Sequence, residues 1–206
     1  MKNTLYYKVI VSLTLSILVT GCSSAPMDDY ERLLTRPNNI TYDSPIDAVH
    51  KVHTTMLPVG EFQSVEIRIT DPIMKLDNVL SNFQVFETKK LDIGSYALEV
   101  GTGCYECLGF RKKTLLPYVQ LYNSNFKQVA SIDQPSKVPF GYSIKKLFDV
   151  LTEDKIFILI AADNRSLGKS SLETSNAYLN SGTIPVTMPV QISPEGNAAV
   201  RLSKIE

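Results

Sequence analysis

Apolar and polar residues alternate along much of this chain with a period of two, which is typical of strands with one buried face. Val65, Ile67 and Ile69, for example, alternate with charged and polar neighbours. The same pattern recurs at residues 94–100, 116–122, 126–132, 184–192 and 198–205. The chain is therefore expected to form many short strands separated by turns.

Two of these segments carry a further signal about their place in a sheet. Residues 155–162, "KIFILIAA", form a continuous apolar run that is too short to cross a membrane. Such a run predicts a central strand that is covered on both faces. Pro185 and Pro189 have no N–H to donate, so the segment 184–192 is expected at the edge of a sheet.

Helical signals are fewer. Ser44, Pro45 and Asp47 have the form of a helix N-terminus, and the helix they begin must end before Pro58. A brief helical turn is expected at residues 28–34, and further helices at residues 142–151 and 169–180. Together the patterns predict a mainly β fold, an antiparallel β-sandwich or jelly-roll-like domain with two or three short helices.

The N-terminus reads as an export signal. Lys2 and Lys8 precede or border an apolar core, which ends in the stretch "LVTGC" at residues 18–22. This stretch resembles a bacterial lipobox, so residues 1–21 are expected to be a lipoprotein signal peptide and Cys22 the site of lipid attachment. The alternative is an ordinary cleaved signal in which Cys22 is incidental. By resemblance to other bacterial lipoproteins, Ser23 favours the periplasm with anchoring to the outer membrane.

The remaining chain is expected to contain a lipidated tether, residues 22–45, and one β-sandwich domain, residues 46–206. Loss of the signal removes two basic residues from the 21 basic and 21 acidic ones, which leaves a net charge of −2. A nearly neutral surface offers no attraction to a phosphate backbone, so nucleic acid is not expected as a partner.

Two further cysteines, Cys104 and Cys107, are separated by two residues. In an oxidising compartment a local disulfide between them is the simplest expectation. A zinc site shared with His50 and His53, or a redox centre, remains an alternative. The histidines are better explained as surface and boundary residues of the short helix that begins near Ser44, and we expect no metal.

A partial match to a nucleotide-binding motif follows the apolar run. Gly168, Lys169 and Ser170 resemble the end of a phosphate-binding loop, but Asp163 stands where that loop needs its first glycine. We therefore expect a loop that leads into a helix, with no nucleotide and no other cofactor. No nucleophile-elbow or zinc-protease motif occurs in the sequence, and no catalytic residue is predicted.

Carbohydrate contact has the most support among binding functions. Tyr118 and Tyr122 are expected on the same face of one strand, where aromatic rings could stack on a sugar. The alternative is that these tyrosines cover a sheet face or lie in the core, which the absence of Trp favours.

The C-terminal half resembles the maltose operon periplasmic protein family. The resemblance rests on "LPYVQLYNSNFKQVASI", "KIFILIAADNRSLGKSSLETSNAYLNSGTIPVTMP" and "GNAAVRLSKI", and it covers roughly residues 83–206. The shared layout includes a polar helix with the pair Ala177-Tyr178. Cys104 and Cys107 depart from the family's pattern, as does the lack of a long helical C-terminal extension.

This resemblance implies a non-enzymatic envelope lipoprotein, accessory to maltose or maltodextrin transport, that binds a glycan or a partner protein. No binding residue of the family is carried over. The alternative is a structural protein-interaction module at the outer membrane that binds no sugar.

Overall fold

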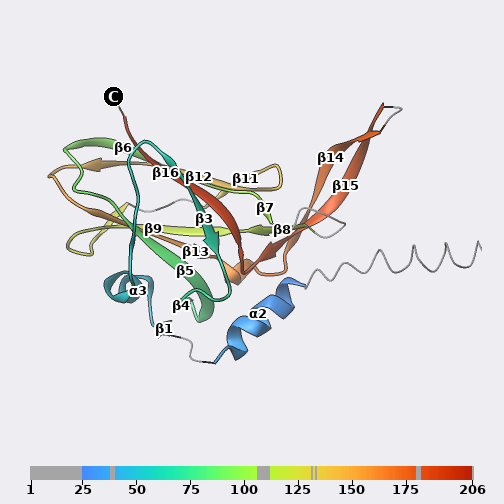
Figure 1. Cartoon of the computed structure of the whole chain (residues 1–206), viewed down its shortest axis with the longest axis horizontal. Coiled ribbons are helices and arrows are strands. Elements are labelled where there is room, and N and C mark those ends of the chain that lie inside the picture. The colour runs from blue at the N-terminus through green and yellow to red at the C-terminus, as the bar shows by residue number, and fades with distance from the viewer. Residues whose placement is uncertain are drawn as a thin grey trace, which may run out of the picture.

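The computed structural model describes residues 25–37, 40–105, 112–130, 132, 134–179 and 182–205. This part of the chain is mainly β, with two α-helices, one 3-10 helix and three sheets. The two larger sheets pack face to face around a shared apolar core (Figure 1). The predicted mainly β, sandwich-like fold is therefore confirmed.

The first layer is a seven-stranded sheet in the order β1-β4-β5-β13-β9-β10, with β2 pairing with β5. Its strands are β1 (Thr41–Tyr42), β2 (Thr55–Met56), β4 (Ile73–Leu76), β5 (Val79–Glu87), β9 (Pro117–Asn123), β10 (Gln128–Ala130) and β13 (Ile156–Ala162).

The second layer is a five-stranded antiparallel sheet in the order β11-β12-β6-β16-β3. Its strands are β3 (Phe62–Ile67), β6 (Gly94–Thr102), β11 (Ser136–Val138), β12 (Gly141–Val150) and β16 (Gly196–Lys204).

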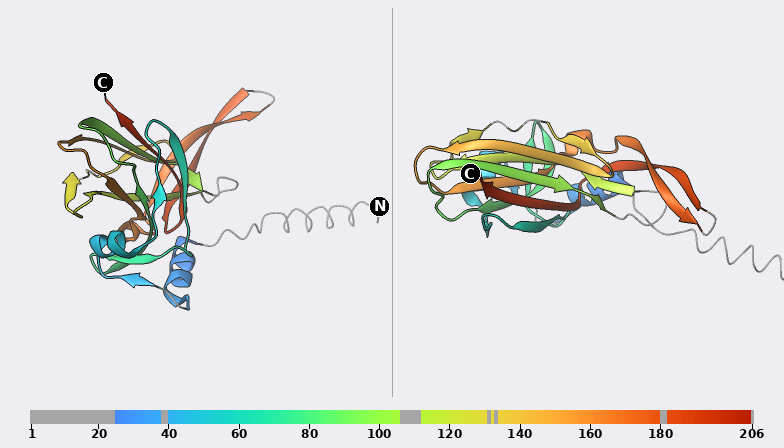
Figure 2. Two further views of the ribbon diagram at one scale, coloured as in Figure 1. Left: turned by 60° about the vertical axis from the view of Figure 1, so that its left-hand side comes forward. Right: turned by 90° about the horizontal axis from the view of Figure 1, so that it is seen from above.

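A third, four-stranded sheet has the order β14-β15-β8-β7. It consists of β7 (Cys104–Tyr105), β8 (Lys112–Leu115), β14 (Ser170–Leu179) and β15 (Gly182–Ser193). The long hairpin β14–β15 extends away from the sandwich as an arm, and both views of Figure 2 show this.

The apolar run of β13 lies in the middle of the seven-stranded sheet. Ile158 and Ile160 point into the core between the two large sheets, whereas Leu159 and Ala161 belong to a second core on the opposite face. The helix α3 (Pro45–Lys51) supplies Ala48 and Val49 to that second core. The prediction of a central strand covered on both faces is confirmed.

The helix α3 begins as its sequence predicts. Ser44 Oγ accepts a hydrogen bond from the backbone N–H of Asp47 at 3.2 Å, and Pro45 occupies the first turn. Such a cap is worth about 1 kcal/mol. His50 and His53 are both exposed, and the His50 ring stacks on Phe126 with 3.5 Å between the ring centroids.

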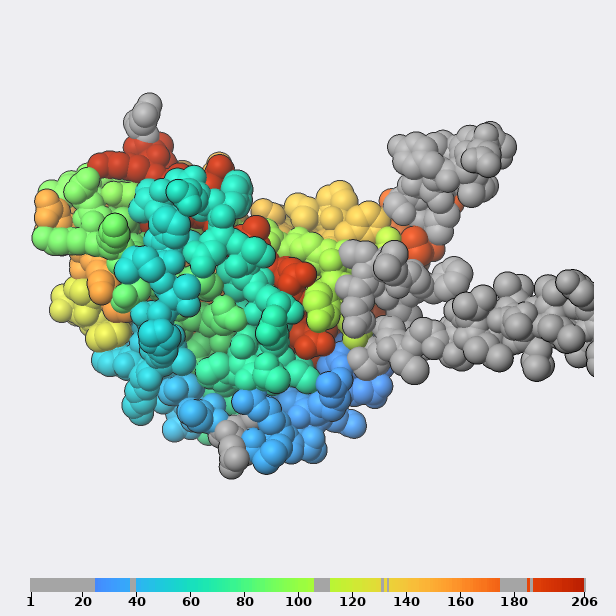
Figure 3. Space-filling view, viewed as in Figure 1, coloured from blue at the N-terminus to red at the C-terminus, as the bar shows by residue number. Residues whose placement is uncertain are grey.

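The helix α2 (Pro26–Thr35) lies within the segment expected to be a tether, where only a brief turn was predicted. Leu33 and Asp29 are completely buried against the body. Asp29 Oδ2 accepts a hydrogen bond from Lys113 Nζ in β8 at 2.8 Å, and the Lys113 side chain is 1% exposed. The surface of α2 is continuous with the neighbouring strands (Figure 3), so this segment is packed onto the domain.

The helix predicted at residues 142–151 is wrong, because this segment forms β12. Ile144, Phe148 and Val150 face the core, but Lys146 occupies the inward position between the first two, and Leu147 faces outward. Because a polar residue takes an inward position and an apolar residue an outward one, the alternation of a strand is hidden and the apolar spacing resembles that of a helix. Eight consecutive pairs with β6 decide the conformation.

The helix predicted at residues 169–180 is also wrong, because residues 170–179 form β14. Ten residue pairs join β14 to β15, and the Thr174 and Thr187 hydroxyls share a hydrogen bond at 2.8 Å across the hairpin. Serine, threonine and asparagine have poor helix propensity, so the pairing strand determines the structure. The polar helix in the family-like layout is absent at these residues.

The edge position expected for residues 184–192 is only locally correct. Pro185 and Pro189 lie where β15 pairs with β14 alone, so their missing N–H groups interrupt no second ladder. From Val190 to Ser193 the strand pairs with β8 as a parallel neighbour, and at Val190 and Gln191 it lies between β14 and β8.

Candidate functional site

A cavity of about 420 Å³ lies where the beginnings of β9 and β12 meet the segment between β13 and β14. Its apolar wall includes Leu116, Pro117, Val119, Ile132, Ile144 and Ile192. Its polar wall includes Gln134, Tyr142, Ser166, Lys169, Ser170 and Ser171, and the remaining lining residues include Tyr118, Asp163 and Arg165. The volume and the mixed lining are typical of a small-molecule site.

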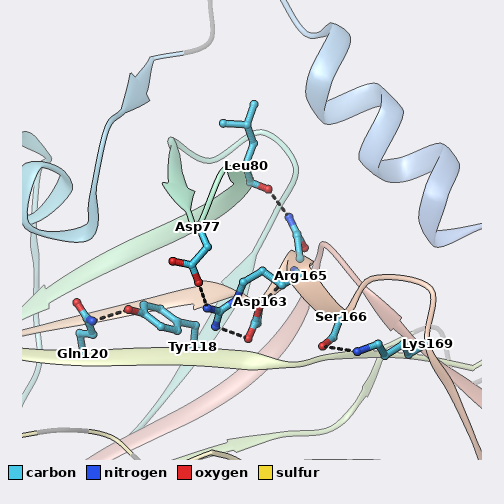
Figure 4. Close-up of polar contacts among 9 residues, drawn as sticks. Asp77, Leu80, Tyr118, Gln120, Asp163, Arg165, Ser166 and Lys169 are labelled. Atoms are coloured by element: carbon cyan, nitrogen blue, oxygen red, sulfur yellow. Dashed lines mark hydrogen bonds and ion pairs between the residues drawn. The ribbon is translucent and has the colours of Figure 1, made fainter.

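Asp163 and Arg165 form a hydrogen-bonded part of this wall (Figure 4). Asp163 directly follows β13 and caps the 3-10 helix η1 (Asn164–Ser166), because its side chain accepts the Arg165 backbone N–H. The Arg165 side chain donates from Nε to Asp163 Oδ1 and from Nη2 to Asp163 Oδ2, both at 2.8 Å. These bonds raise the pKa of Arg165 above its usual value and hold the guanidinium in one orientation.

Arg165 also connects two other elements. Its Nη1 donates to Asp77 Oδ2 at 2.5 Å, and its guanidinium lies 5.5 Å from the centroid of the Tyr118 ring. Asp77 and Asn78 have φ values of 47° and 69°, as in the two-residue turns that favour these residue types, and they join β4 to β5. The guanidinium thus fixes the β4–β5 turn beside the first tyrosine of β9.

Tyr118 and Tyr122 lie on one face of β9, as predicted, with Gln120 between them. The Gln120 side chain donates to the Tyr118 hydroxyl and accepts from the Tyr122 hydroxyl. Tyr118 is half-buried, lines the cavity and packs against the second core, whereas Tyr122 is 5% exposed and belongs to that core. Burial raises the pKa of Tyr122 to about 12 and also raises the pKa of Tyr118.

Tyr122 is therefore a core residue, as the alternative to glycan contact allowed. Its place in the predicted binding surface is taken by Tyr142, which lines the cavity from β12. Burial raises the pKa of the Tyr142 hydroxyl, which makes no hydrogen bond to another described residue. Gln134, likewise free of such bonds, adds a side-chain amide to the same wall.

A close approach of two backbones positions Tyr142. A Cβ built on the preceding residue, Gly141, would lie 2.0 Å from the Thr102 carbonyl oxygen, so only glycine fits there. The approach lets Tyr142 N–H donate to Thr102 Oγ1 at 2.9 Å. The start of β12 is thereby held against β6 at the mouth of the cavity.

The stretch Gly168-Lys169-Ser170 forms a loop, as predicted, but it leads into β14. Gly168 has a φ of +74°, and its N–H donates to Ile192 O at 3.2 Å. The Lys169 N–H donates to Ser166 O, also at 3.2 Å. Because these amides are used within the fold, they are not available to cradle a phosphate.

The cysteine predictions fall largely outside the described residues. Cys104 begins β7 and is disulfide-bonded, but Cys107 and Cys22 lie outside the described part of the chain. The Cys104–Cys107 pairing and the lipid on Cys22 stay predictions. Within residues that the structure describes, no group of three histidine, cysteine or acidic side chains is placed to hold a metal ion.

The paired hydrogen bonds between Arg165 and Asp163 were not predicted from the sequence. There Asp163 served only to argue against a phosphate-binding loop. The available signal was the spacing Asp-x-Arg immediately after a buried strand, because a carboxylate at a short helix N-terminus can accept from both the backbone and the following arginine.

Comparisons with known proteins add little to this geometry. No protein-family model matches the chain, and no curated protein is significantly similar to it in sequence. Among solved structures it is similar to the pre-peptidase C-terminal domain of a collagenase from Bacillus anthracis, at a TM-score of 0.35 and 6% identity. That match covers 73% of this chain and 94% of the other, and at this TM-score it carries no argument about function. None of the described helices has the length and hydropathy to span a membrane.

Proposed function

We propose that this chain is a non-enzymatic envelope lipoprotein that binds a carbohydrate in the cavity beside Tyr118, as an accessory to carbohydrate uptake. The observation that carries the proposal is the composition of the cavity. Two half-buried tyrosines, Tyr118 and Tyr142, line it together with aliphatic side chains and with amide, hydroxyl and ammonium groups. A sugar offers apolar C–H faces and a rim of hydroxyls, which such a wall complements.

A binding role suits this cavity better than a catalytic one. Asp163 is the carboxylate that lines it, and both of its oxygens accept hydrogen bonds from Arg165. A carboxylate whose two oxygens are both held by one guanidinium is not placed to act on a substrate. It serves to orient the guanidinium.

The lipid anchor and the link to maltodextrin uptake come from the sequence. The lipobox-like stretch ends at Cys22, and α2 begins four residues later and is bound to the body through Asp29. If Cys22 carries the lipid, the domain sits close to the membrane surface on a very short tether. The resemblance to the maltose operon periplasmic proteins makes maltodextrins the first neutral glycans to test.

Isothermal titration calorimetry against a panel of neutral and charged oligosaccharides tests the proposal. Tyr118→Ala should weaken binding by at least about tenfold, the equivalent of one good aromatic contact. Phe62→Ala is the matched control, because Phe62 is 62% exposed on β3 and lies outside the cavity lining. Absence of binding to every glycan at millimolar concentration would overturn the proposal.

The second candidate is a protein-interaction module, and the β14–β15 arm favours it. The arm projects from the sandwich (Figure 1), and Leu172 near its base is 73% exposed. A photoreactive amino acid at position 172 should cross-link to an envelope protein in intact cells if the arm binds a partner. The same group at Leu147, which is 58% exposed on β12, controls for non-specific capture.

A further inference from the structure

The charges that line the cavity are not balanced. Among the lining residues, Arg165 and Lys169 are positive and Asp163 is negative. Arg165 pairs with Asp163 and also with Asp77, which lies outside the lining. The Lys169 ammonium forms no ion pair with any described carboxylate, and its nearest polar contact is Ser166 Oγ at 3.4 Å (Figure 4). Lys169 is therefore the lining cation that no described carboxylate contacts directly.

The other charged groups near this wall have partners of their own. Glu173, on β14 a few residues beyond Lys169, pairs with Lys137 at 2.6 Å and also contacts the Ser171 hydroxyl. Within the described chain, no carboxylate of β11 or β14, the elements that flank Lys169, forms an ion pair with it. A negatively charged ligand group would find its counter-ion here.

Two serine hydroxyls belong to lining residues close to Lys169. Ser166 already touches it, and Ser170 follows it directly at the start of β14, where it also lines the cavity. One ammonium and two hydroxyls match the two oxygens of a single carboxylate. A phosphate would need more donors, and the amides of Gly168 and Lys169 are bonded within the fold.

We propose that the preferred ligand is an acidic carbohydrate whose carboxylate pairs with Lys169 while a sugar ring lies against Tyr118 and Tyr142. This inference rests on the proposed function and names its ligand class. Removing the charge from the ligand should weaken binding by about tenfold, the size of one charge-assisted hydrogen bond. The preference should shrink as salt rises, because Lys169 is exposed to solvent.

A matched pair of ligands provides the test. Calorimetry compares an α-1,4-linked hexagalacturonate with the same hexasaccharide as its uncharged methyl ester, and maltohexaose serves as the unrelated neutral glycan. The acid should bind about ten times more tightly than the ester to the wild-type chain. Lys169→Gln should abolish that difference, whereas Lys127→Gln, an exposed lysine outside the cavity lining, should preserve it.

The outcomes separate this inference from the function on which it rests. If acid and ester bind equally, or if maltohexaose binds and the acid does not, the acidic ligand is excluded and carbohydrate binding stands. If Lys169→Gln retains the preference, the assignment to Lys169 is wrong. If none of the three glycans nor the rest of the panel binds, the proposed function itself fails.

Discussion

Two ion-pair groups in this protein join aspartate to a basic side chain in opposite surroundings. The first, Asp29 with Lys113, joins α2 to β8 with side chains that are 0% and 1% exposed. The second, Arg165 with Asp163 and Asp77, borders the cavity with side chains that are 36%, 16% and 78% exposed. Distances within the two groups are similar, at 2.8 Å for Lys113–Asp29 and 2.8 Å for Arg165–Asp163.

The difference in burial gives these groups different tasks. A buried charge without its partner is costly, so the Asp29–Lys113 pair fixes α2 in one position. The Arg165 group remains in contact with water, contributes less to stability, and keeps a planar cation at a wall that a ligand can reach. Complete burial of an ion pair thus favours a structural role, and partial exposure of an ion pair favours a binding role.

Lys113→Ala should have the largest effect of the changes considered. It removes the buried ammonium that pairs with Asp29, leaves that carboxylate buried beside Arg32 at 3.3 Å, and should lower the free energy of unfolding by about 3–5 kcal/mol. Chemical denaturation followed by circular dichroism measures this loss. Lys75→Ala, which removes an exposed pair with Asp43, should cost no more than about 1 kcal/mol.

A double replacement sharpens the same comparison. Asp29→Leu combined with Lys113→Met removes both charges and should restore most of the stability lost in Lys113→Ala. If Lys113→Ala alone cost as little as Lys75→Ala, the sealed pair would not hold α2, and the contrast between the two groups would disappear.

Tyr118, Gln120 and Tyr122 form a hydrogen-bonded row on β9 that runs from the cavity into the second core. Tyr122, at the buried end of this row, makes the stability of the fold depend on pH. Burial raises the pKa of Tyr122 to about 12 in the folded chain, while an unfolded tyrosine titrates near pH 10. The unfolded state therefore loses its proton first, and the folded state loses stability as pH rises from about 10 to about 12. Spectrophotometric titration and denaturation across this range should show the effect in the wild type and a smaller one in Tyr122→Phe.

A control separates Tyr122 from general alkaline damage. Tyr30→Phe removes a partly exposed tyrosine on α2 and should leave the alkaline loss unchanged. Equal alkaline profiles for the wild type and Tyr122→Phe would show that Tyr122 is more accessible than its 5% exposure implies.

Arg165→Ala should cost about 1 kcal/mol of stability, because Asp163 is partly exposed and water replaces the lost donors. Its effect on glycan binding should be larger than its effect on stability, since the change removes a wall of the cavity and releases the side of the Tyr118 ring. Calorimetry and denaturation on the same variant give both values. Arg68→Ala, which removes an exposed pair with Glu66, is the control with neither effect.

The sequence predicted the strands well where one pattern acted alone. The alternation at Val65 and Ile67 and the apolar run of β13 report burial directly, and both were confirmed. In β12 the inward position of Lys146 concealed the period, and in β14 the pairing with β15 overrode the local pattern. Such positions depend on distant neighbours, which a local pattern does not contain.

The candidate site was harder to predict for the same reason. Tyr118 and Tyr122 were correctly placed on one face, but their different burial depends on the second core, which α3 helps to build. The buried pair of Asp29 with Lys113 joins residues 84 positions apart, in a segment whose composition suggested a tether. Only the short-range spacing of Asp163 and Arg165 could have been recognised from the chain alone.

The smallest expected effect concerns Glu195, whose carboxyl interacts electrostatically with the buried pair of Asp29 and Lys113. Burial raises the pKa of this carboxyl, and the charge of Asp29 acts in the same direction. Its ionised form is therefore disfavoured in the folded state, and stability falls as pH rises from its ordinary pKa of about 4.5 through the raised value. Glu195→Gln removes that loss, so the variant should melt about 1–2 °C higher than the wild type at pH 7 and at the same temperature at pH 3.

Glu153→Gln should show the opposite sign at pH 7, because a hydrogen bond from Lys90 lowers the pKa of Glu153. A gain at pH 7 for Glu195→Gln that persisted at pH 3 would mean that packing, and not the charge beside Asp29, sets the effect.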